Sequence, residues 1–448
     1  MFPAQTYQDR RQNLANHLDS GLILIPGNNE APMNYTDNVY PFRQDSSFRY
    51  FAGVNKPGFV LTIDASSGES TLYGNDVSLD HIVWMGEQPS VRELAAQAGI
   101  DKTGNLADLT GGLTATKQRV HYLPPYREER FRQLQIWLGK SRANIELGIS
   151  ENLVRAVIAL RSIKSAEEVA QMEIAVNTTR RMHHAAMDHA APGMLEAEVA
   201  GLIEGIAIQG DGRLAYPAIV TRNGHILHNH YHGNELKEGD LLLIDAGAET
   251  PTGYAGDITR TFCVGREMDN RQKAVYDIVK KAEEEVIADL QPGVAYRDCH
   301  AQAGRIIVSG LKNLGLMQGD PAQAVAEGAH ALFMPHGLGH HIGMDVHDME
   351  DLGEDLVGYD EEIKRSKQFG TNALRLGKKL EVGNVITVEP GIYFIPALID
   401  RWEAEGKFTS FINYNKLQDF RDFGGIRIED NVLITETGSR VLGEAILK

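Results

Sequence analysis

The chain has 448 residues and a formal net charge of −17, from 44 Lys and Arg against 61 Asp and Glu. This length exceeds what one hydrophobic core usually organises, so we expect two domains, and the acidic balance disfavours nucleic acid and anionic membranes as partners because both attract clustered cations. The chain has only two cysteines, no signal-peptide core and no apolar run near ~18 residues. We therefore expect a cytoplasmic protein with no membrane partner.

The first part of the chain mixes short apolar runs, such as residues 21–26 and 58–63, with stretches of helical periodicity. This alternation predicts an α/β domain. A serine followed by acidic residues at 165–168 is typical of a helix start. We therefore expect an N-terminal domain over 1–160 and a second domain over 161–448.

The second domain carries a hint of internal duplication. A helical run that ends in Pro192-Gly193 and is followed by another helix recurs at Pro292-Gly293, 100 residues later. Such a repeat favours two related α/β halves with a site between them. A Pro-Gly turn between helices is also common by chance, so a plain helix-turn-helix stays open as the alternative.

Two stretches, 351–379 and 396–423, are predicted to be insertions. The first is charged and weakly periodic, and the second is polar and aromatic. Long loops often act as lids over a site. A solvated surface excursion explains each stretch equally well, because charge runs usually mark exposed faces.

Two carboxylates stand at the ends of predicted strands. An apolar strand over 241–245 ends in Asp245, and a second strand over 256–262 begins with Asp257. The turn residues at 250–253 predict that the strands pair as a hairpin, which would bring the two acids together. A buried acid pair needs a cation between its members, whereas two unrelated acids that face solvent would need none.

The histidines cluster in the second domain. The stretch His336-Gly337-Leu338-Gly339-His340 is rich in glycine, so it does not predict the helical zinc pattern with two ligands on one face, and one ligand is the expectation. His347 follows shortly after, and His228 belongs to an earlier group. Any one of these would more often be a surface or hydrogen-bonded histidine, and their closeness to paired acids is what favours a functional site.

Two more acids occur in β-branched strands. Glu389 follows residues 385–388, and Glu429 shares a predicted strand face with Arg427. Each glutamate alone would more often lie on a solvent face. Together, two Asp, two Glu and one His are mostly oxygen donors, which suit a pair of ions such as Mn²⁺, Co²⁺, Fe²⁺ or Zn²⁺ and hydrolytic chemistry.

These motifs resemble those of the proline-specific metallopeptidases with the "pita-bread" fold, and most closely aminopeptidase P. The resemblance rests on ordered motifs at 245–247, 256–262, 336–340, 345–348, 389–393 and 426–430, and in the first domain at 40–48 and 84–86. It implies an α/β (α+β) protein: an N-terminal α/β domain and a C-terminal pita-bread domain with pseudo-symmetric halves around a dinuclear metal site. The chain departs from the family pattern by one extra residue between Asp245 and Asp257 and by the two insertions.

The resemblance also implies a role for each candidate residue. The expected metal ligands are Asp245, Asp257, His340, Glu389 and Glu429. Glu389 would also take a proton from water, His228 and His347 would contact the substrate and stabilise the oxyanion, and further catalytic or substrate-binding candidates are His336, Arg427, Tyr393 and Trp84.

The function that this resemblance implies is release of the N-terminal residue from peptides with proline in the second position. The cofactor is expected to be two divalent ions, most often Mn²⁺, and the protein is expected to form a homodimer or homotetramer in which Trp84 reaches a neighbouring site. Prolidase, which accepts only Xaa-Pro dipeptides, is the closest alternative. A binding module without catalysis and a metal-free creatinase-like hydrolase are further alternatives, and both are disfavoured by the complete ligand set.

Overall fold

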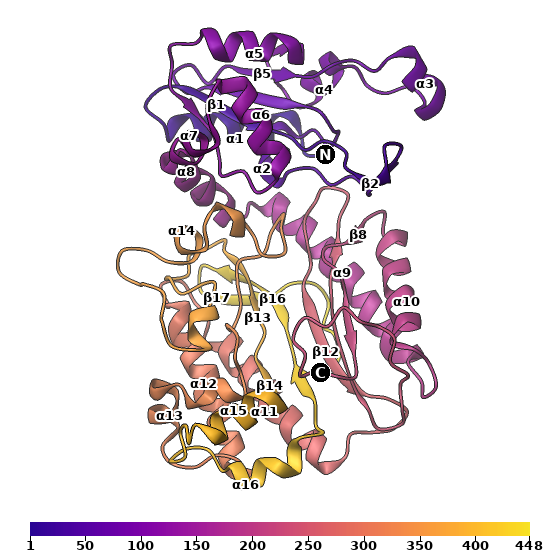
Figure 1. Cartoon of the computed structure of the whole chain (residues 1–448), viewed down its shortest axis with the longest axis vertical. Coiled ribbons are helices and arrows are strands. Elements are labelled where there is room, and N and C mark those ends of the chain that lie inside the picture. Colours follow the sequence, from indigo (N-terminus) through magenta and orange to yellow (C-terminus); the bar gives the residue numbers. More distant parts are fainter. The chain divides into compact units, whose positions relative to one another are not determined.

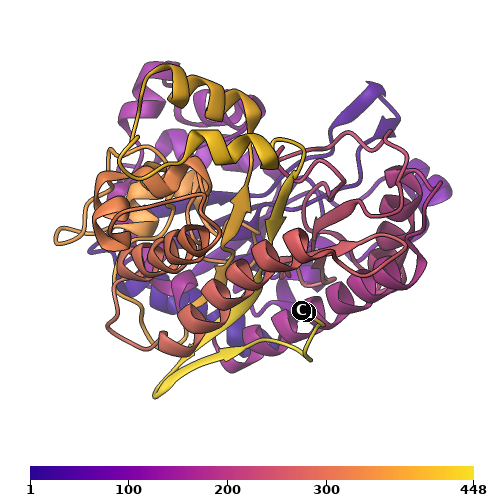
Figure 2. The same cartoon turned by 90° about the horizontal axis from the view of Figure 1, so that it is seen from below.

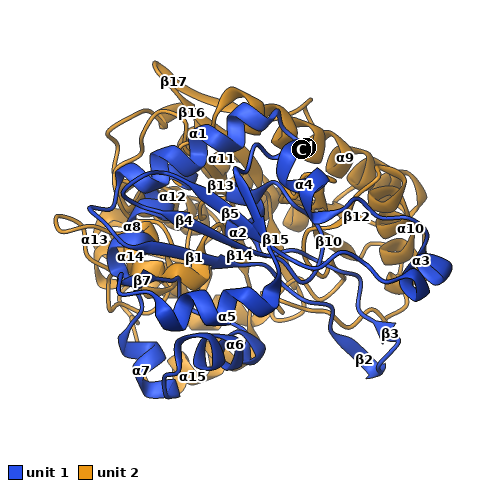
Figure 3. Cartoon of the chain, turned by 90° about the horizontal axis from the view of Figure 1, so that it is seen from above, with its two compact units in different colours: residues 1–161 blue, residues 162–448 orange.

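The computed structural model describes residues 1–448, which divide into two compact units, Met1–Arg161 and Ser162–Lys448 (Figure 3). Each unit is described by itself. None of the helices combines the length and the apolar character needed to cross a membrane.

The first unit is an α/β domain, as the sequence predicted, and it is built on a mixed five-stranded sheet in the order β6-β5-β4-β1-β7. Strand β1 pairs antiparallel with β4 and parallel with β7. The apolar runs expected to be strands form β1 and β4, and Leu24 and Val60 from these strands pack with Trp137 in the core. The elements are α1 (Ala4–Asn16), β1 (Leu22–Pro26), β2 (Pro32–Tyr35), β3 (Asn38–Val39), α2 (Ser46–Ala52), β4 (Val60–Asp64), β5 (Ser70–Tyr73), α3 (Leu79–Met85), α4 (Val91–Gln97), β6 (Lys102–Gly104), α5 (Leu106–Ala115), β7 (Val120–His121), α6 (Glu128–Leu138), α7 (Arg142–Leu147) and α8 (Glu151–Ser162).

The second unit begins with the helix start predicted at Ser165. The Ser165 hydroxyl accepts a hydrogen bond from the Glu168 backbone, and the Glu168 carboxylate accepts one from Ser165 N, which is a capping box. The helices of the unit are α9 (Ala166–His189), α10 (Glu196–Gln209), α11 (Asn270–Asp289), α12 (Tyr296–Asn313), α13 (Pro321–Glu327), η1 (Ala329–Leu332), η2 (Glu350–Leu352), α14 (Glu354–Gly358), η3 (Thr371–Ala373), α15 (Pro396–Ala404), α16 (Tyr414–Leu417) and η4 (Gln418–Phe420). Its strands are β8 (Arg213–Leu214), β9 (Ile219–Thr221), β10 (Leu241–Ala246), β11 (Ala248–Glu249), β12 (Ile258–Cys263), β13 (Val385–Val388), β14 (Gly391–Tyr393), β15 (Gly425–Arg427), β16 (Asp430–Thr435) and β17 (Gly438–Val441).

The internal duplication is visible in the backbone hydrogen bonds of the second unit. Gly193, between α9 and α10, donates its N–H to Leu236 O at 2.8 Å, and Gly293, between α11 and α12, donates to Leu380 O at the same distance. Both glycines have positive φ, 92° and 86°, a conformation that other residues adopt only at a cost. The two helix pairs, coloured magenta and salmon to orange, occupy separate parts of the unit (Figures 1 and 2). The shared hydrogen bond and backbone conformation support the predicted duplication over a chance helix-turn-helix.

The two halves meet where strand β12 of the first half lies beside Glu429 of the second half. Strands β10 and β12 form the predicted antiparallel hairpin, with Asp245 opposite Thr259. Thr259 then pairs with Glu429, whose N–H donates to Thr259 O at 3.1 Å. This pairing brings the acids of the first half next to those of the second.

The prediction that Glu389 and Glu429 lie within strands is wrong in detail. Glu389 occupies the break between β13 and β14, and Glu429 occupies the break between β15 and β16. At both points the chain leaves one sheet for another, since β13 pairs with β16 whereas β14 pairs with β15. A strand break frees a side chain from the alternation of the sheet and lets both glutamates face the same space.

The two predicted insertions differ in structure. Residues 396–423 form α15, α16 and η4, and their aromatic residues, including Trp402 and Phe420, are buried in a hydrophobic core of the second unit. A solvated excursion is therefore excluded for this stretch. Residues 351–379 are mostly irregular, but Leu374 and Leu376 are buried on either side of Arg375 and anchor this part of the loop.

A substitution at Gly247 tests the close packing that brings the acids together. A Cβ added to Gly247, directly after β10, would lie 1.7 Å from Gly256 O, a backbone atom just before β12, so Gly247→Ala must push these two segments apart. Overpacking of this kind costs about 1–3 kcal/mol. We expect a lower Tm and weaker metal binding, measured by thermal unfolding and by calorimetric titration with Mn²⁺.

The matched control is Gly201→Ala on α10, where an added Cβ meets no atom within 4 Å. Because alanine favours a helix over glycine by up to ~1 kcal/mol, this variant should keep or raise the Tm. Equal Tm values for both variants would contradict the role assigned to Gly247.

Candidate metal centre and active site

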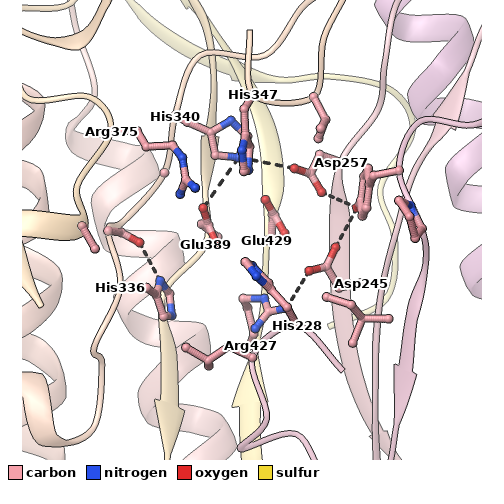
Figure 4. Close-up of a pocket in the computed structure, with 18 of the residues that line it drawn as sticks. His228, Asp245, Asp257, His336, His340, His347, Arg375, Glu389, Arg427 and Glu429 are labelled. Atoms are coloured by element: carbon pink, nitrogen blue, oxygen red, sulfur yellow. Dashed lines mark hydrogen bonds and ion pairs between the residues drawn. The ribbon is translucent and has the colours of Figure 1, made fainter. Parts of the chain in front are cut away.

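A cavity of about 430 Å³ in the second unit contains most of the predicted site residues. Figure 4 shows four carboxylates, those of Asp245, Asp257, Glu389 and Glu429, directed into one space. The remaining lining residues are Tyr216, Pro217, Ile219, Leu227, His228, His230, Pro335, His336, Gly337, Gly339, His340, Val346, His347, Ala373, Arg375 and Arg427. The cavity thus combines hard oxygen donors with imidazoles.

Three of these side chains form a compact group of potential metal ligands. One ligand atom each from Asp257, His340 and Glu429 lies within 4.8 Å of the others, and all three residues are buried. His340 Nδ1 donates to His341 O at 2.9 Å, which leaves Nε2 with a free electron pair, 3.4 Å from Asp257 Oδ2 and 3.7 Å from Glu389 Oε1. A histidine whose second nitrogen is held in this way is oriented for metal binding.

The carboxylates cannot all stay ionised without added positive charge. Burial, together with neighbouring carboxylates, raises the pKa of Glu389 to about 8 and raises the pKa of Glu429 well above its ordinary value. Arg427 is the cation nearest to this group and offsets a single negative charge. The donor set therefore fits divalent cations, which would keep every carboxylate ionised.

Asp245 is held by two side chains at the edge of this group. Its Oδ1 accepts a hydrogen bond from Tyr216 OH at 2.6 Å, and its Oδ2 pairs with Arg427 Nη2 at 2.6 Å. Tyr216 OH also contacts Asp257. Arg427 Nε donates to Thr259 Oγ1, which in turn donates to Glu429 Oε2 at 2.6 Å. Asp245, Asp257 and Glu429 are therefore oriented by one connected network.

His336 lies in the cavity wall with both ring nitrogens engaged. Nδ1 donates to Gly337 O at 2.7 Å, so Nε2 accepts a hydrogen bond from Tyr393 OH at 2.9 Å. Tyr393 OH also accepts from Arg427 Nη1 at 2.8 Å. Burial lowers the pKa of His336 to about 3, which keeps the ring neutral. His336 and Tyr393 thus orient Arg427 and have no free hydrogen-bonding group for acid–base chemistry in this arrangement.

His347 stands on the other side of the cavity, with its ring centroid 4.4 Å from that of His340. Its Nδ1 pairs with Glu350 Oε2 at 2.6 Å, and Arg375 Nε lies 3.2 Å from the same oxygen. These two contacts lower the pKa of Glu350 to about 2, with the His347 hydrogen bond contributing most, so Glu350 stays ionised.

The structure brings nearly all the predicted site residues together. Tyr393 contacts the cavity wall through His336 and Arg427. Trp84 is the exception, because it belongs to the first unit, where it is 84% exposed on α3, and it does not line this cavity. No pattern in the sequence indicated Tyr216 and Arg375, which lie in irregular segments, or Glu350, which begins the short helix η2.

Comparison with protein families gives two matches. The model of metallopeptidase family M24 matches residues 170–436, and the model of the aminopeptidase P N-terminal domain matches residues 7–122. Each match lies within one of the two compact units.

Individual relatives cover almost the whole chain. A Xaa-Pro aminopeptidase of Escherichia coli (strain K12) is 31% identical over 99% of this chain and 95% of its own, and a human Xaa-Pro dipeptidase is 31% identical over 94% and 85%. Among solved structures, proline aminopeptidase P II from Yersinia pestis aligns with a TM-score of 0.82 at 32% identity, over 100% of this chain and 97% of its own. The expected resemblance and fold class are confirmed, and the chain belongs to metallopeptidase family M24.

Proposed function

We propose that this protein is a two-metal Xaa-Pro aminopeptidase, which hydrolyses the peptide bond before a proline in the second position. The observation that carries the proposal is the meeting of Asp257, His340 and Glu429 with Asp245 and Glu389 around one cavity. Relatives named Xaa-Pro aminopeptidase, at 31% identity across the chain, support the substrate class. Proline peptides need a dedicated enzyme because the ring removes an N–H and fixes the chain.

Asp245, Asp257, His340, Glu389 and Glu429 would hold two divalent ions, and Mn²⁺ is the ion we propose. Oxygen-rich sites with one imidazole suit Mn²⁺, whereas Zn²⁺, Co²⁺ and Fe²⁺ would also bind such donors. When bound, the ions lower the pKa of water and stabilise negative charge as the peptide carbonyl is attacked.

The side chains of the cavity would supply the remaining chemistry. Glu389 accepts the proton of the attacking water and passes it to the leaving nitrogen. His228 and His347 contact the substrate and stabilise the developing oxyanion. Arg427 keeps Asp245 in place, and His336 and Tyr393 keep Arg427 in place, through the hydrogen bonds described above.

A second candidate, Xaa-Pro dipeptidase, is favoured by Arg375. This cation lines the cavity, is directed toward Glu389 in Figure 4, and its two carboxylate partners, Glu350 and Glu354, are half-exposed. A guanidinium suits the free carboxylate of a dipeptide, which a longer peptide would present elsewhere. The human relative named Xaa-Pro dipeptidase supports this candidate.

We further propose a cytoplasmic homodimer or homotetramer with a domain boundary near residue 160. The exposed apolar side chains of α3, Leu79, Val83, Trp84 and Met85, favour burial against another copy. The aminopeptidase P N-terminal domain would then carry the contacts between subunits.

Removal of metal should abolish activity. Chelated protein is expected to lose cleavage of an Arg-Pro-Pro peptide by about 10³-fold or more, because bound ions stabilise the transition state by several kcal/mol, and added Mn²⁺ should restore it. Asp257→Asn should stay inactive with Mn²⁺, whereas Asp277→Asn, an exposed acid on α11, should behave as wild type. Full turnover by chelated protein would exclude a metal mechanism.

Arg375→Ala should separate the two substrate classes. Loss of a charge-assisted hydrogen bond costs ~1.5–3 kcal/mol, so we expect kcat/KM for a Gly-Pro dipeptide to fall about 10- to 100-fold. Cleavage of Arg-Pro-Pro should change little. Arg401→Ala, which removes an exposed arginine paired with Glu405, is the control. An equal loss of kcat/KM for both substrates would show that Arg375 does not bind the dipeptide carboxylate.

Trp84→Ala tests the proposed assembly. Wild-type protein should sediment as a dimer or tetramer, and the variant should shift toward smaller species as its activity falls. Ile136→Ala, an exposed apolar residue on α6 of the same unit, should keep the wild-type mass. A fully active wild-type monomer would remove Trp84 from the site.

A further inference from the structure

The turn that follows His347 has an unusual backbone. Met349 has a φ of 64°, a region that residues with side chains rarely adopt, although its side chain is buried. Backbone hydrogen bonds hold the turn on both sides, because Asp348 N donates to His341 O and Leu352 N donates to Met349 O, each at 2.9 Å. Conformations of this kind gather at functional sites, where the surrounding structure maintains them.

This turn directs Glu350 back toward the residue three positions earlier. Its Oε2 accepts a hydrogen bond from His347 Nδ1 at 2.6 Å and lies 3.2 Å from Arg375 Nε. Both partners line the cavity, whereas Glu350 itself does not. One carboxylate oxygen thus connects a cavity histidine to a cavity arginine from outside the cavity.

No other carboxylate described in the structure makes both contacts. Glu354 lies 3.7 Å from Arg375 and 2.7 Å from Arg365, and it has no recorded contact with His347. The ring of His340 packs against His347 with an interplanar angle of 67°, but its Nδ1 is used by His341 O and its Nε2 lies by Asp257 and Glu389, so the contact between the two rings is one of packing.

We propose that Glu350 is a positioning residue, which fixes the proton of His347 on Nδ1, turns Nε2 to the substrate and holds Arg375 at the cavity wall. A carboxylate on one imidazole nitrogen sets both the tautomer and the orientation of the ring. The alternative explanation of the Glu350 contacts is a half-exposed ion pair that contributes little to stability. The proposal rests on the proposed peptidase function for its kinetic part only.

The tautomer of His347 can be measured without any activity. The full-length protein, loaded with diamagnetic Zn²⁺ and labelled with ¹⁵N-histidine, gives ring nitrogen shifts by NMR, and His347→Asn identifies the signals of His347. We expect a protonated Nδ1 in the wild type and in Glu354→Gln. In Glu350→Ala the pattern should move toward the Nε2-protonated form that free imidazole favours. An unchanged His347 pattern in Glu350→Ala would overturn the proposal.

Steady-state kinetics then test the consequence for catalysis. Glu350→Ala should lower kcat/KM for Arg-Pro-Pro by 10- to 100-fold, the usual effect of removing a partner of a site histidine. Glu350→Gln, which keeps an acceptor oxygen, should recover part of that loss. Glu354→Gln should keep kcat for Arg-Pro-Pro, because it leaves the His347 contact intact. A loss in Glu354→Gln equal to that in Glu350→Ala would overturn the link to His347.

The proposed peptidase function and the positioning role of Glu350 can be disproved separately. If the wild type cleaves no Xaa-Pro substrate, the proposed function is wrong, and the NMR result alone decides whether Glu350 sets the tautomer. If the wild type is active and Glu350→Ala keeps full kcat/KM with an unchanged Tm, the positioning role is wrong while the proposed function stands.

Discussion

The structure depends on the gathering of four carboxylates, two of them buried, around one imidazole. Charges of one sign repel strongly in a region that excludes water, so the arrangement needs both hydrogen-bond donors and cations. The chain supplies these donors: the Tyr216 hydroxyl, whose one proton is shared between Asp245 and Asp257, the Thr259 hydroxyl to Glu429, and Arg427 to Asp245. The charge that remains is what fits this cavity to divalent cations.

The duplication explains how one chain assembles such a site. The first half supplies Asp245 and Asp257 from a hairpin, and the second half supplies Glu389 and Glu429 from two strand breaks. The bridge between Thr259 and Glu429 joins the halves at the position where the acids meet. Each half carries its own helix pair, α9 with α10 and α11 with α12, and regular elements of this kind are what the proposed metal site requires.

The long segments of the second half have unequal roles. Residues 396–423 fold into helices whose aromatic side chains complete a core, which makes them part of the scaffold. Residues 350–375 remain largely irregular, and they bring Glu350 and Arg375 to His347.

The sequence by itself determined the elements and motifs that depend on local patterns. The capping serine Ser165 and the hairpin that carries Asp245 and Asp257 both follow from spacing and alternation over a few residues. Only the tertiary structure decided which polar groups meet. Tyr216 and Arg375 are far from the ligands in sequence and lie in irregular chain, and His336 loses its free nitrogens to Gly337 and Tyr393. Such contacts are set by how the two halves pack, and packing between distant segments leaves no period in the sequence.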